Sequence, residues 1–421
     1  MLAIQLVTSG LLSLRGASYV FRLFQPWFDG GTPCHTVIQN WVLRLGLYNL
    51  NKAKEKRDDW IYILDHTIEF GQKKCLLILG ITLENFRKNK YKITHKDVEV
   101  LSIDIETKAD AFSVKQSLEK CSKITGSPIQ IISDHGSNIW KGISEYIVSA
   151  SRTIIQTYDV THKASIILKK QLENNDRWKI FVNNISYTKK SLVHTILAFM
   201  APGKPKEKAR WLNLENYLLW AQSSLQQAKK KMNKIEQEKF DEKVLWIKDF
   251  KKDIKEWSNM LMMLNILKNE VKVNGLSSCS LRNIDEKLKK SKIKINSIPL
   301  QETYSEITKY LNEEISGLKG VFLGCTDIIE SVFGKYKNFS AKSPMKEIGK
   351  SILTVPVFTS EITPEIIKVA MEETTTKDVN RWLKKNIGKS LLSKRRTFLK
   401  LGKAKKYMKK LFENMQKVAS F

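Results

Sequence analysis

The chain has 421 residues, which is long enough for two or three domains. Its 72 lysines and arginines outnumber 43 aspartates and glutamates, so the formal net charge is +29 and an anionic partner such as nucleic acid is favoured. Hydrophobic residues make up 42% of the sequence, which is enough to bury a core and excludes a wholly disordered chain.

Residues 1–55 predict helices separated by a turn. Apolar residues recur near the start, and Asp29 is followed by two glycines, which mark the turn. The segment after the turn carries three side chains that a DNA recognition helix could present, Gln39, Asn40 and Arg44. The pattern is compatible with a helix-turn-helix DNA-binding region, and it fits a plain structural pair of helices at least as well.

The next segment, 56–172, predicts strands and helices in a mixed order. Strands are expected over 60–65, 75–81, 98–105, 128–134 and 153–158, and helices over 111–124, 138–150 and 162–172. The order begins with a meander of three strands and continues with helical crossovers. This order is typical of an α/β fold with a mixed sheet.

The second half of the chain is predicted to be mainly helical. Apolar residues between 210 and 315 step by three and four, which predicts a pair of long amphipathic helices. Acids offset much of the lysine charge there. From Arg381 onward the composition is almost purely cationic, with Glu413 as the single acid, so this region is expected to bind phosphate.

Two aspartates fall at the ends of predicted strands. Asp65 ends the first strand and Asp134 ends the fourth. A single aspartate at a strand end is usually a turn or helix cap. In a sheet of this order, however, the first and fourth strands can lie side by side with their ends at one edge, so the two carboxylates would meet. Paired carboxylates that share divalent ions suit phosphoryl transfer, and oxygen ligands suit Mg²⁺ or Mn²⁺.

A third acid is expected from a helix packed at the same edge. The candidates are Glu302, Glu306, Glu313, Glu314 and Glu330. Glu330 is preferred because it lies on a short predicted helix, 326–337, directly after the long helical block. Lys335 and Lys337 follow one to two turns later, where they could hold phosphate.

These residues resemble the DDE transposases of bacterial insertion sequences, which have an RNase H-like catalytic core. The six residues between Glu330 and Lys337 match the spacing of the family's Glu-to-Lys signature. Leu323 and Thr326 stand where that signature has a tyrosine and an arginine. Some related families carry a Cys-x-x-His after the fifth strand, and this chain keeps its histidine as His162.

The resemblance implies an α/β fold: an RNase H-like mixed sheet with a large helical insertion, plus helical N-terminal and C-terminal regions. The implied ranges are 1–55 for the N-terminal helices, 56–172 for the first part of the core, 173–320 for the insertion, 321–345 for the return to the core with the catalytic helix, and 346–421 for the basic C-terminal region.

The resemblance also implies an activity, which is metal-dependent cleavage of DNA ends and strand transfer. Asp65, Asp134 and Glu330 would be both the catalytic residues and the ligands of Mg²⁺ or Mn²⁺. Double-stranded DNA, as element ends and target, would be the partner, and a homodimer would synapse two ends. The predicted DNA-binding residues are His162, Lys335, Lys337, Arg395, Arg396, Lys405 and Lys406.

Two alternatives remain open at this point. One is a catalytically decayed transposase that acts only as a DNA-binding protein, and the other is an RNase H-like nuclease that cuts without joining. The five scattered cysteines argue against a zinc ribbon or a disulfide framework and favour a reducing cytoplasm, here at the nucleoid. No apolar run approaches the roughly 20 residues of a membrane span, so no membrane partner is expected.

Overall fold

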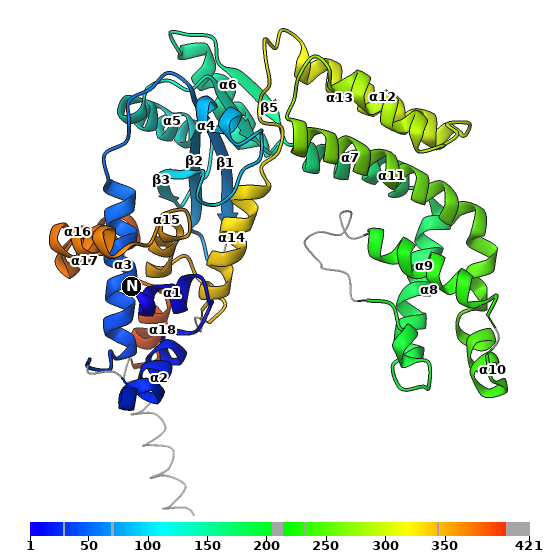
Figure 1. Cartoon of the computed structure of the whole chain (residues 1–421), viewed down its shortest axis with the longest axis horizontal. Helices are drawn as coiled ribbons and strands as arrows, with labels where there is room; N and C mark the ends of the chain where they lie inside the picture. Colours follow the sequence, from blue (N-terminus) through cyan, green and yellow to red (C-terminus); the bar gives the residue numbers. More distant parts are fainter. Residues whose placement is uncertain (28–29, 69–70, 204–213, 231, 343–344, 401–421) are drawn as a thin grey trace, which may run out of the picture. The chain divides into compact units, whose positions relative to one another are not determined.

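The computed structural model describes residues 1–421 apart from 28–29, 69–70, 204–213, 231, 343–344 and 401–421 (Figure 1). The chain forms two compact units. Unit 1 comprises residues 1–156 and 326–421, and unit 2 comprises residues 157–325. None of the described helices is long and apolar enough to cross a membrane.

A five-stranded mixed sheet organises unit 1. Its strands are β1 (Trp60–Ile68), β2 (Lys74–Thr82), β3 (Glu99–Glu106), β4 (Gln130–Ser133) and β5 (Ile155–Tyr158), of which the last two residues of β5 are assigned to unit 2. The spatial order is β3-β2-β1-β4-β5, in which β1, β2 and β3 pair antiparallel and β1 pairs parallel with β4. This is the predicted RNase H-like sheet. Buried β-branched and leucine side chains fill its strands, as expected of strands covered on both faces.

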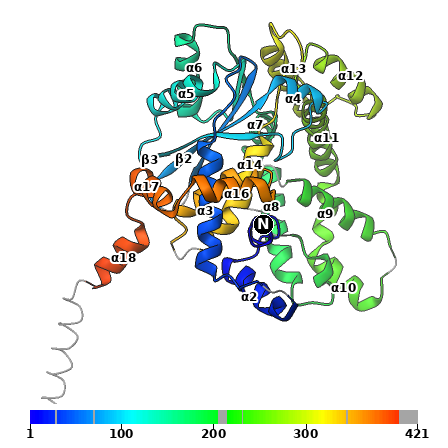
Figure 2. The same cartoon turned by 60° about the vertical axis from the view of Figure 1, so that its left-hand side comes forward.

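One face of the sheet is covered by α5 (Ala111–Thr125) and α6 (Ser137–Ser149), and the short α4 (Leu83–Lys88) follows β2. Side chains of alternate β1 residues, including Tyr62 and Leu64, join the core beneath α5 and α6. A capping box between Asp110 and Ser113 fixes the start of α5. Figure 2 shows α5 and α6 on one side of the strands and α3, α14 and α16 on the opposite side.

The opposite face is covered by helices from both ends of the chain. The N-terminal helices are α1 (Leu2–Thr8), α2 (Leu14–Phe24), η1 (Gln25–Trp27) and α3 (His35–Asn51), and the C-terminal ones are α14 (Asp327–Ser340), η5 (Lys350–Thr354), α15 (Val355–Phe358), α16 (Pro364–Glu373), α17 (Thr376–Asn386) and α18 (Leu391–Lys400). Of these, α3 and α15 pack against β3, and α14 packs against β1. The described helices of residues 1–55 and 346–400 therefore belong to unit 1.

The helix α3 is a core helix of unit 1. Its buried side chains, including Ile38 and Val42, pack against α1, α2 and α16. Arg44 donates from Nε to the carbonyl of Thr374 at 2.6 Å and from a terminal nitrogen to the carbonyl of Met371, so it satisfies the end of α16. Of the two interpretations of residues 1–55, these contacts favour the plain structural pair of helices over a recognition helix.

Unit 2 is helical. It contains α7 (Val160–Leu172), α8 (Asp176–Leu192), η2 (Ala198–Met200), α9 (Leu214–Gln227), α10 (Lys234–Lys243), η4 (Leu245–Phe250), α11 (Lys251–Asn274), α12 (Ser280–Lys290) and α13 (Ile298–Ile315). The described residues of the range predicted as an insertion are therefore mainly helical. Unit 2 also includes α7, which packs against α11 and α13.

The expected pair of long helices in unit 2 is wrong. A capping box between Asn233 and Glu236 starts the separate helix α10, and the 3₁₀ segment η4 separates α10 from α11. The aromatic side chains of Phe181, Phe250 and Trp257 pack at this break, with ring centroids 5.0 to 6.4 Å apart. Packing of these large rings decides the local structure more strongly than helical periodicity does.

Candidate active site

Asp65 and Asp134 lie side by side at one edge of the sheet. The parallel register of β1 and β4 pairs Leu64 with Ser133, and the two aspartates are the next residues along these two strands. Both side chains are half-buried. The antiparallel register on the other side pairs Asp65 with Leu77 of β2. Asp65 lies inside β1, which continues to Ile68, so the prediction that Asp65 ends its strand is wrong; Asp134 directly follows β4, and the register makes the two acids neighbours.

Asp65 lies on the face of the sheet opposite to α5 and α6. Tyr62 and Leu64 point toward α5 and α6, so the alternation of β1 places Asp65 on the opposite face, which α14 covers. Its carboxylate accepts the backbone N–H of His66 at 2.6 Å. The carboxylate of Asp134 accepts the N–H of Gly136 at 3.1 Å, in the turn that leads into α6.

Glu330 lies in the first turn of α14, which packs against β1. Three neighbouring side chains anchor the helix and are fully or nearly fully buried: Ile329, Val332 and Phe333. The Glu330 side chain is exposed. An acid in the first turn of a helix is favoured by the helix dipole. In the part of the chain that the structure describes, the carboxylates of Asp65, Asp134 and Glu330 are not gathered within 4.8 Å of one another.

A second acid shares that first turn. Asp327 is half-buried at the start of α14, three residues before Glu330. Its position directly before the apolar residues of the helix is typical of a helix cap, so the sequence gives no signal that Asp327 belongs to a site.

The other candidates for the third acid belong to α13 in unit 2. Three of them already bond within that unit: Glu302 accepts from Gln171 at 3.0 Å, Glu306 from Lys170 at 2.6 Å, and Glu314 from the N–H of Tyr158 at 2.9 Å. Burial raises the pKa of the Glu314 carboxyl to about 7. Glu313 is exposed and lies 4.0 Å from Lys309. These contacts give the α13 acids structural partners within unit 2.

His162 begins α7 of unit 2 beside a buried acid. Asp159 is fully buried, caps α7 by accepting the N–H groups of Thr161 and His162, and also bonds to Nδ1 of His162 at 2.6 Å. An oxygen of Asp159 lies within 4.8 Å of Sγ of Cys325. Only His162 of this pair was predicted from the sequence. The spacing of Asp159 and His162, three residues apart, could have indicated the pairing, because an aspartate often caps a helix that begins after it.

The predicted basic contacts differ in exposure. Lys335 is half-buried with its ammonium 5.8 Å from the centroid of the Phe358 ring, whereas Lys337 is exposed above the Phe333 ring at 6.0 Å. Arg395 and Arg396 lie exposed on α18. Lys405 and Lys406 lie outside the described residues.

Another set of polar side chains occupies the same edge on the α5 face. Asp104 accepts from the hydroxyl of Ser102 at 2.7 Å, and Glu106 accepts from the hydroxyl of Ser113 at 3.0 Å. Nε2 of His66 lies 3.7 Å from the Glu106 carboxylate. These acids are tied to the start of α5 and to their own strand, so they have a structural role.

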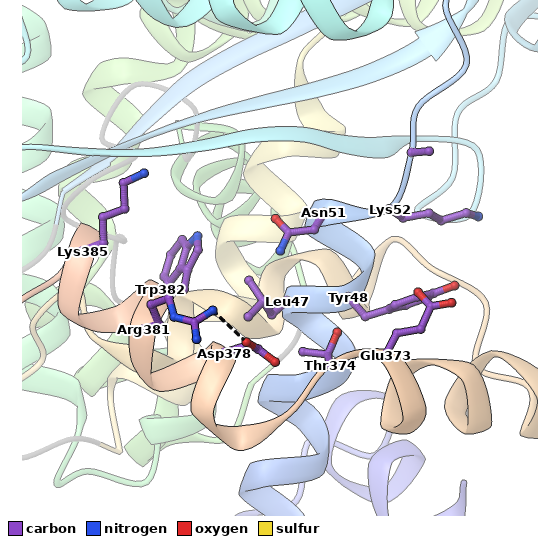
Figure 3. A pocket seen from close by; sticks show the side chains of 11 residues that line it. Leu47, Tyr48, Asn51, Lys52, Glu373, Thr374, Asp378, Arg381, Trp382 and Lys385 are labelled. Atoms are coloured by element: carbon purple, nitrogen blue, oxygen red, sulfur yellow. Dashed lines mark hydrogen bonds and ion pairs between the residues drawn. The ribbon is translucent and has the colours of Figure 1, made fainter.

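A pocket of about 630 Å³ lies between the end of α3 and α17, in the basic C-terminal region (Figure 3). Tyr48 and Trp382 supply aromatic surface, and Arg381 and Lys385 supply positive charge. Arg381 is already paired with Asp378 at 3.2 Å. Part of the positive charge of this pocket is therefore balanced within the protein.

Neither a family model nor a curated protein matches the sequence. Among solved structures, the chain is similar to the one described as the Drosophila P element transposase strand transfer complex. The two share 12% sequence identity with a TM-score of 0.41, over 86% of this chain and 91% of that chain.

Proposed function

We propose that the protein is a metal-dependent DNA phosphoryltransferase that cleaves the ends of a mobile element and joins them to target DNA. The observation that carries this proposal is the register of β1 and β4, which sets Asp65 and Asp134 next to each other on one edge of an RNase H-like sheet. The net charge of +29 supports a polyanionic substrate.

The donor set fits Mg²⁺ or Mn²⁺. Asp65 and Asp134 offer half-buried carboxylate oxygens, and hard divalent cations prefer oxygen ligands. Glu330 completes the proposed set from α14. The ligand atoms of these three described residues do not all lie within 4.8 Å of one another, so a shared ion would have to draw them together by neutralising the repulsion between the carboxylates. Ions held there would activate an attacking oxygen and stabilise the leaving oxygen of an in-line displacement.

The chain's own residues supply the remaining parts of the proposal. Lys335, Lys337, Arg395 and Arg396 would neutralise phosphates of double-stranded DNA, and the contacts of His162 with Asp159 fix its ring at the start of α7 for the same purpose. We place Lys405 and Lys406 in this set from composition alone. Two copies of the chain would hold two DNA ends in the joining step, which makes a homodimer the expected assembly.

Strand joining separates this proposal from a nuclease. Purified full-length protein with Mn²⁺ is incubated with duplexes that carry the sequences flanking its coding region, and nicks and joined products are resolved on a denaturing gel. The transposase proposal predicts nicking, and predicts joined product from a pre-cleaved 3′-hydroxyl end. Nicking without joined product would instead support the RNase H-like nuclease.

A decayed, DNA-binding form is the second alternative, and the same assay tests it. The proposal expects Asp65→Asn to abolish nicking while leaving DNA binding intact. Binding without cleavage by the unsubstituted protein, on ends that it protects from a footprinting nuclease, would favour the decayed form.

A further inference from the structure

The face of α14 that follows Glu330 meets a polar loop from the sheet. Ser331 and Lys335 lie one helical turn apart on α14. The loop between α4 and β3 supplies His95, whose Nε2 lies 3.2 Å from the Ser331 hydroxyl. A pocket of about 700 Å³ opens there, lined by Thr94, His95, Lys96 and Lys335 together with residues of α1 and of the segment around Phe358.

Two basic groups of this pocket are partly removed from water. Lys335 is half-buried, and burial lowers the pKa of its ammonium group. His95 is half-buried as well, and its pKa is lowered first by burial and then by the positive charge of Lys335. The carboxyl that lines the same pocket, Glu361, is exposed. Within the described part of the chain, neither His95 nor Lys335 forms an ion pair with a carboxylate.

Partial burial of a lysine beside a histidine costs hydration, and the two groups repel when both are charged. The charge of an anion bound between them would compensate for the lost hydration and offset the repulsion. The surrounding groups suit a phosphate, because Lys96 and the side chain of Lys335 donate from charged nitrogens and the imidazole of His95 donates a further hydrogen bond once protonated.

We propose that His95, Lys96 and Lys335 form a binding site for a backbone phosphate of DNA, beside the α14 turn that carries Glu330. The site rests on the proposed function, since it gives the DNA a contact on the catalytic helix. In this assignment His95 is a positioning residue, held to α14 through Ser331. His95 was not among the residues predicted from the sequence. The sequence offered no signal for it, because His95 lies in a polar loop far from Lys335 along the chain.

The experiment measures equilibrium binding of a short DNA duplex as a function of salt, in the Asp65→Asn background so that cleavage does not interfere. Lys335→Gln is expected to weaken binding about tenfold and to reduce the salt slope by about one, as loss of one phosphate contact does. His95→Gln retains hydrogen bonding to Ser331 without the charge and is expected to weaken binding severalfold.

Two further variants separate a specific contact from a general loss of charge. Lys141→Gln removes one exposed lysine from α6, on the other face of the sheet, and is expected to leave the affinity nearly unchanged. Lys335→Arg keeps the charge and is expected to restore most of the binding. Circular dichroism melts of all variants confirm that each remains folded.

A spectroscopic readout tests the site without cleavage. The imidazole C–H signals of His95, assigned by their loss in His95→Gln, are expected to shift when duplex DNA is added. Unchanged affinity in both Lys335→Gln and His95→Gln, or an equal loss in Lys141→Gln, would overturn the proposed site. A shift with inorganic phosphate but none with DNA would overturn it too. If the binding results hold while Asp65→Asn still cleaves DNA, the phosphate site stands and the proposed catalytic function fails.

Discussion

The two faces of the sheet carry acids at the same edge but in different surroundings. On the α5 face, Asp104 and Glu106 accept hydrogen bonds from serine hydroxyls of their own strand and of α5. On the α14 face, Asp65 lies in register beside Asp134, and both side chains bond to the backbone N–H of a residue one or two positions later. An acid on β1 thus becomes a candidate ligand because a second acid, directly after the adjacent parallel strand, lies beside it.

The largest expected effect comes from replacing either aspartate on the α14 face. Asp65→Asn or Asp134→Asn is expected to lower the rate of DNA cleavage by roughly 10³-fold or more, because each removes a charged ligand from the proposed ion site. Single-turnover cleavage of an end-labelled duplex measures the rate. Asp104→Asn is the matched control on the α5 face, and it should keep nearly full activity. Equal losses of cleavage rate in all three variants would show that the acids of the two faces do not differ in function.

The next effect concerns the third acid. Glu330→Gln is expected to lower cleavage by roughly 10²-fold, since it removes one carboxylate from a shared site, whereas Glu106→Gln should change the rate little. The same single-turnover assay applies. Asp327→Asn tests the neighbouring acid of the α14 turn. A larger loss in Asp327→Asn than in Glu330→Gln would assign the third position to Asp327.

The smallest effect tests the structural role of the α5 face. Ser113→Ala removes a hydrogen bond to Glu106 and one half of the capping box of α5, so it should lower the free energy of unfolding by about 1 kcal/mol while cleavage stays unchanged. Denaturant unfolding measures the difference. Ser149→Ala, at the end of α6, serves as the control because its hydroxyl bonds only to nearby backbone carbonyls. Reduced cleavage by Ser113→Ala with an unchanged free energy of unfolding would show that the α5 face contributes to catalysis.

The strands and the acids that follow their apolar runs could be predicted because neighbouring residues in the sequence determine both. Residues of β1 and β4 form mainly apolar runs, and the acids that follow these runs, Asp65 and Asp134, are visible from the sequence. The order of strands and helices then restricts the topologies that place β1 beside β4. These two steps predicted the placement of Asp65 and Asp134, while their roles remain proposals.

The remaining features depend on tertiary packing. The core position of α3 follows from its contacts with α15 and α16, which lie more than 300 residues later, and so its Arg44 looked like an exposed recognition residue. The break between α10 and α11 depends on packed aromatic rings. The pairing of His95 with Lys335 depends on a loop meeting a helix. None of these has a periodic pattern in the sequence.

The central claim is that Asp65 and Asp134 share a divalent ion. Binding of Mn²⁺ to the full-length protein, followed by electron paramagnetic resonance of the unbound ion, measures it without DNA or cleavage. We expect the unsubstituted protein to have an Mn²⁺ site that is lost or strongly weakened in both Asp65→Asn and Asp134→Asn and is retained in Asp104→Asn. Unchanged Mn²⁺ binding in the Asp65 and Asp134 variants would show that these two carboxylates do not hold the ion.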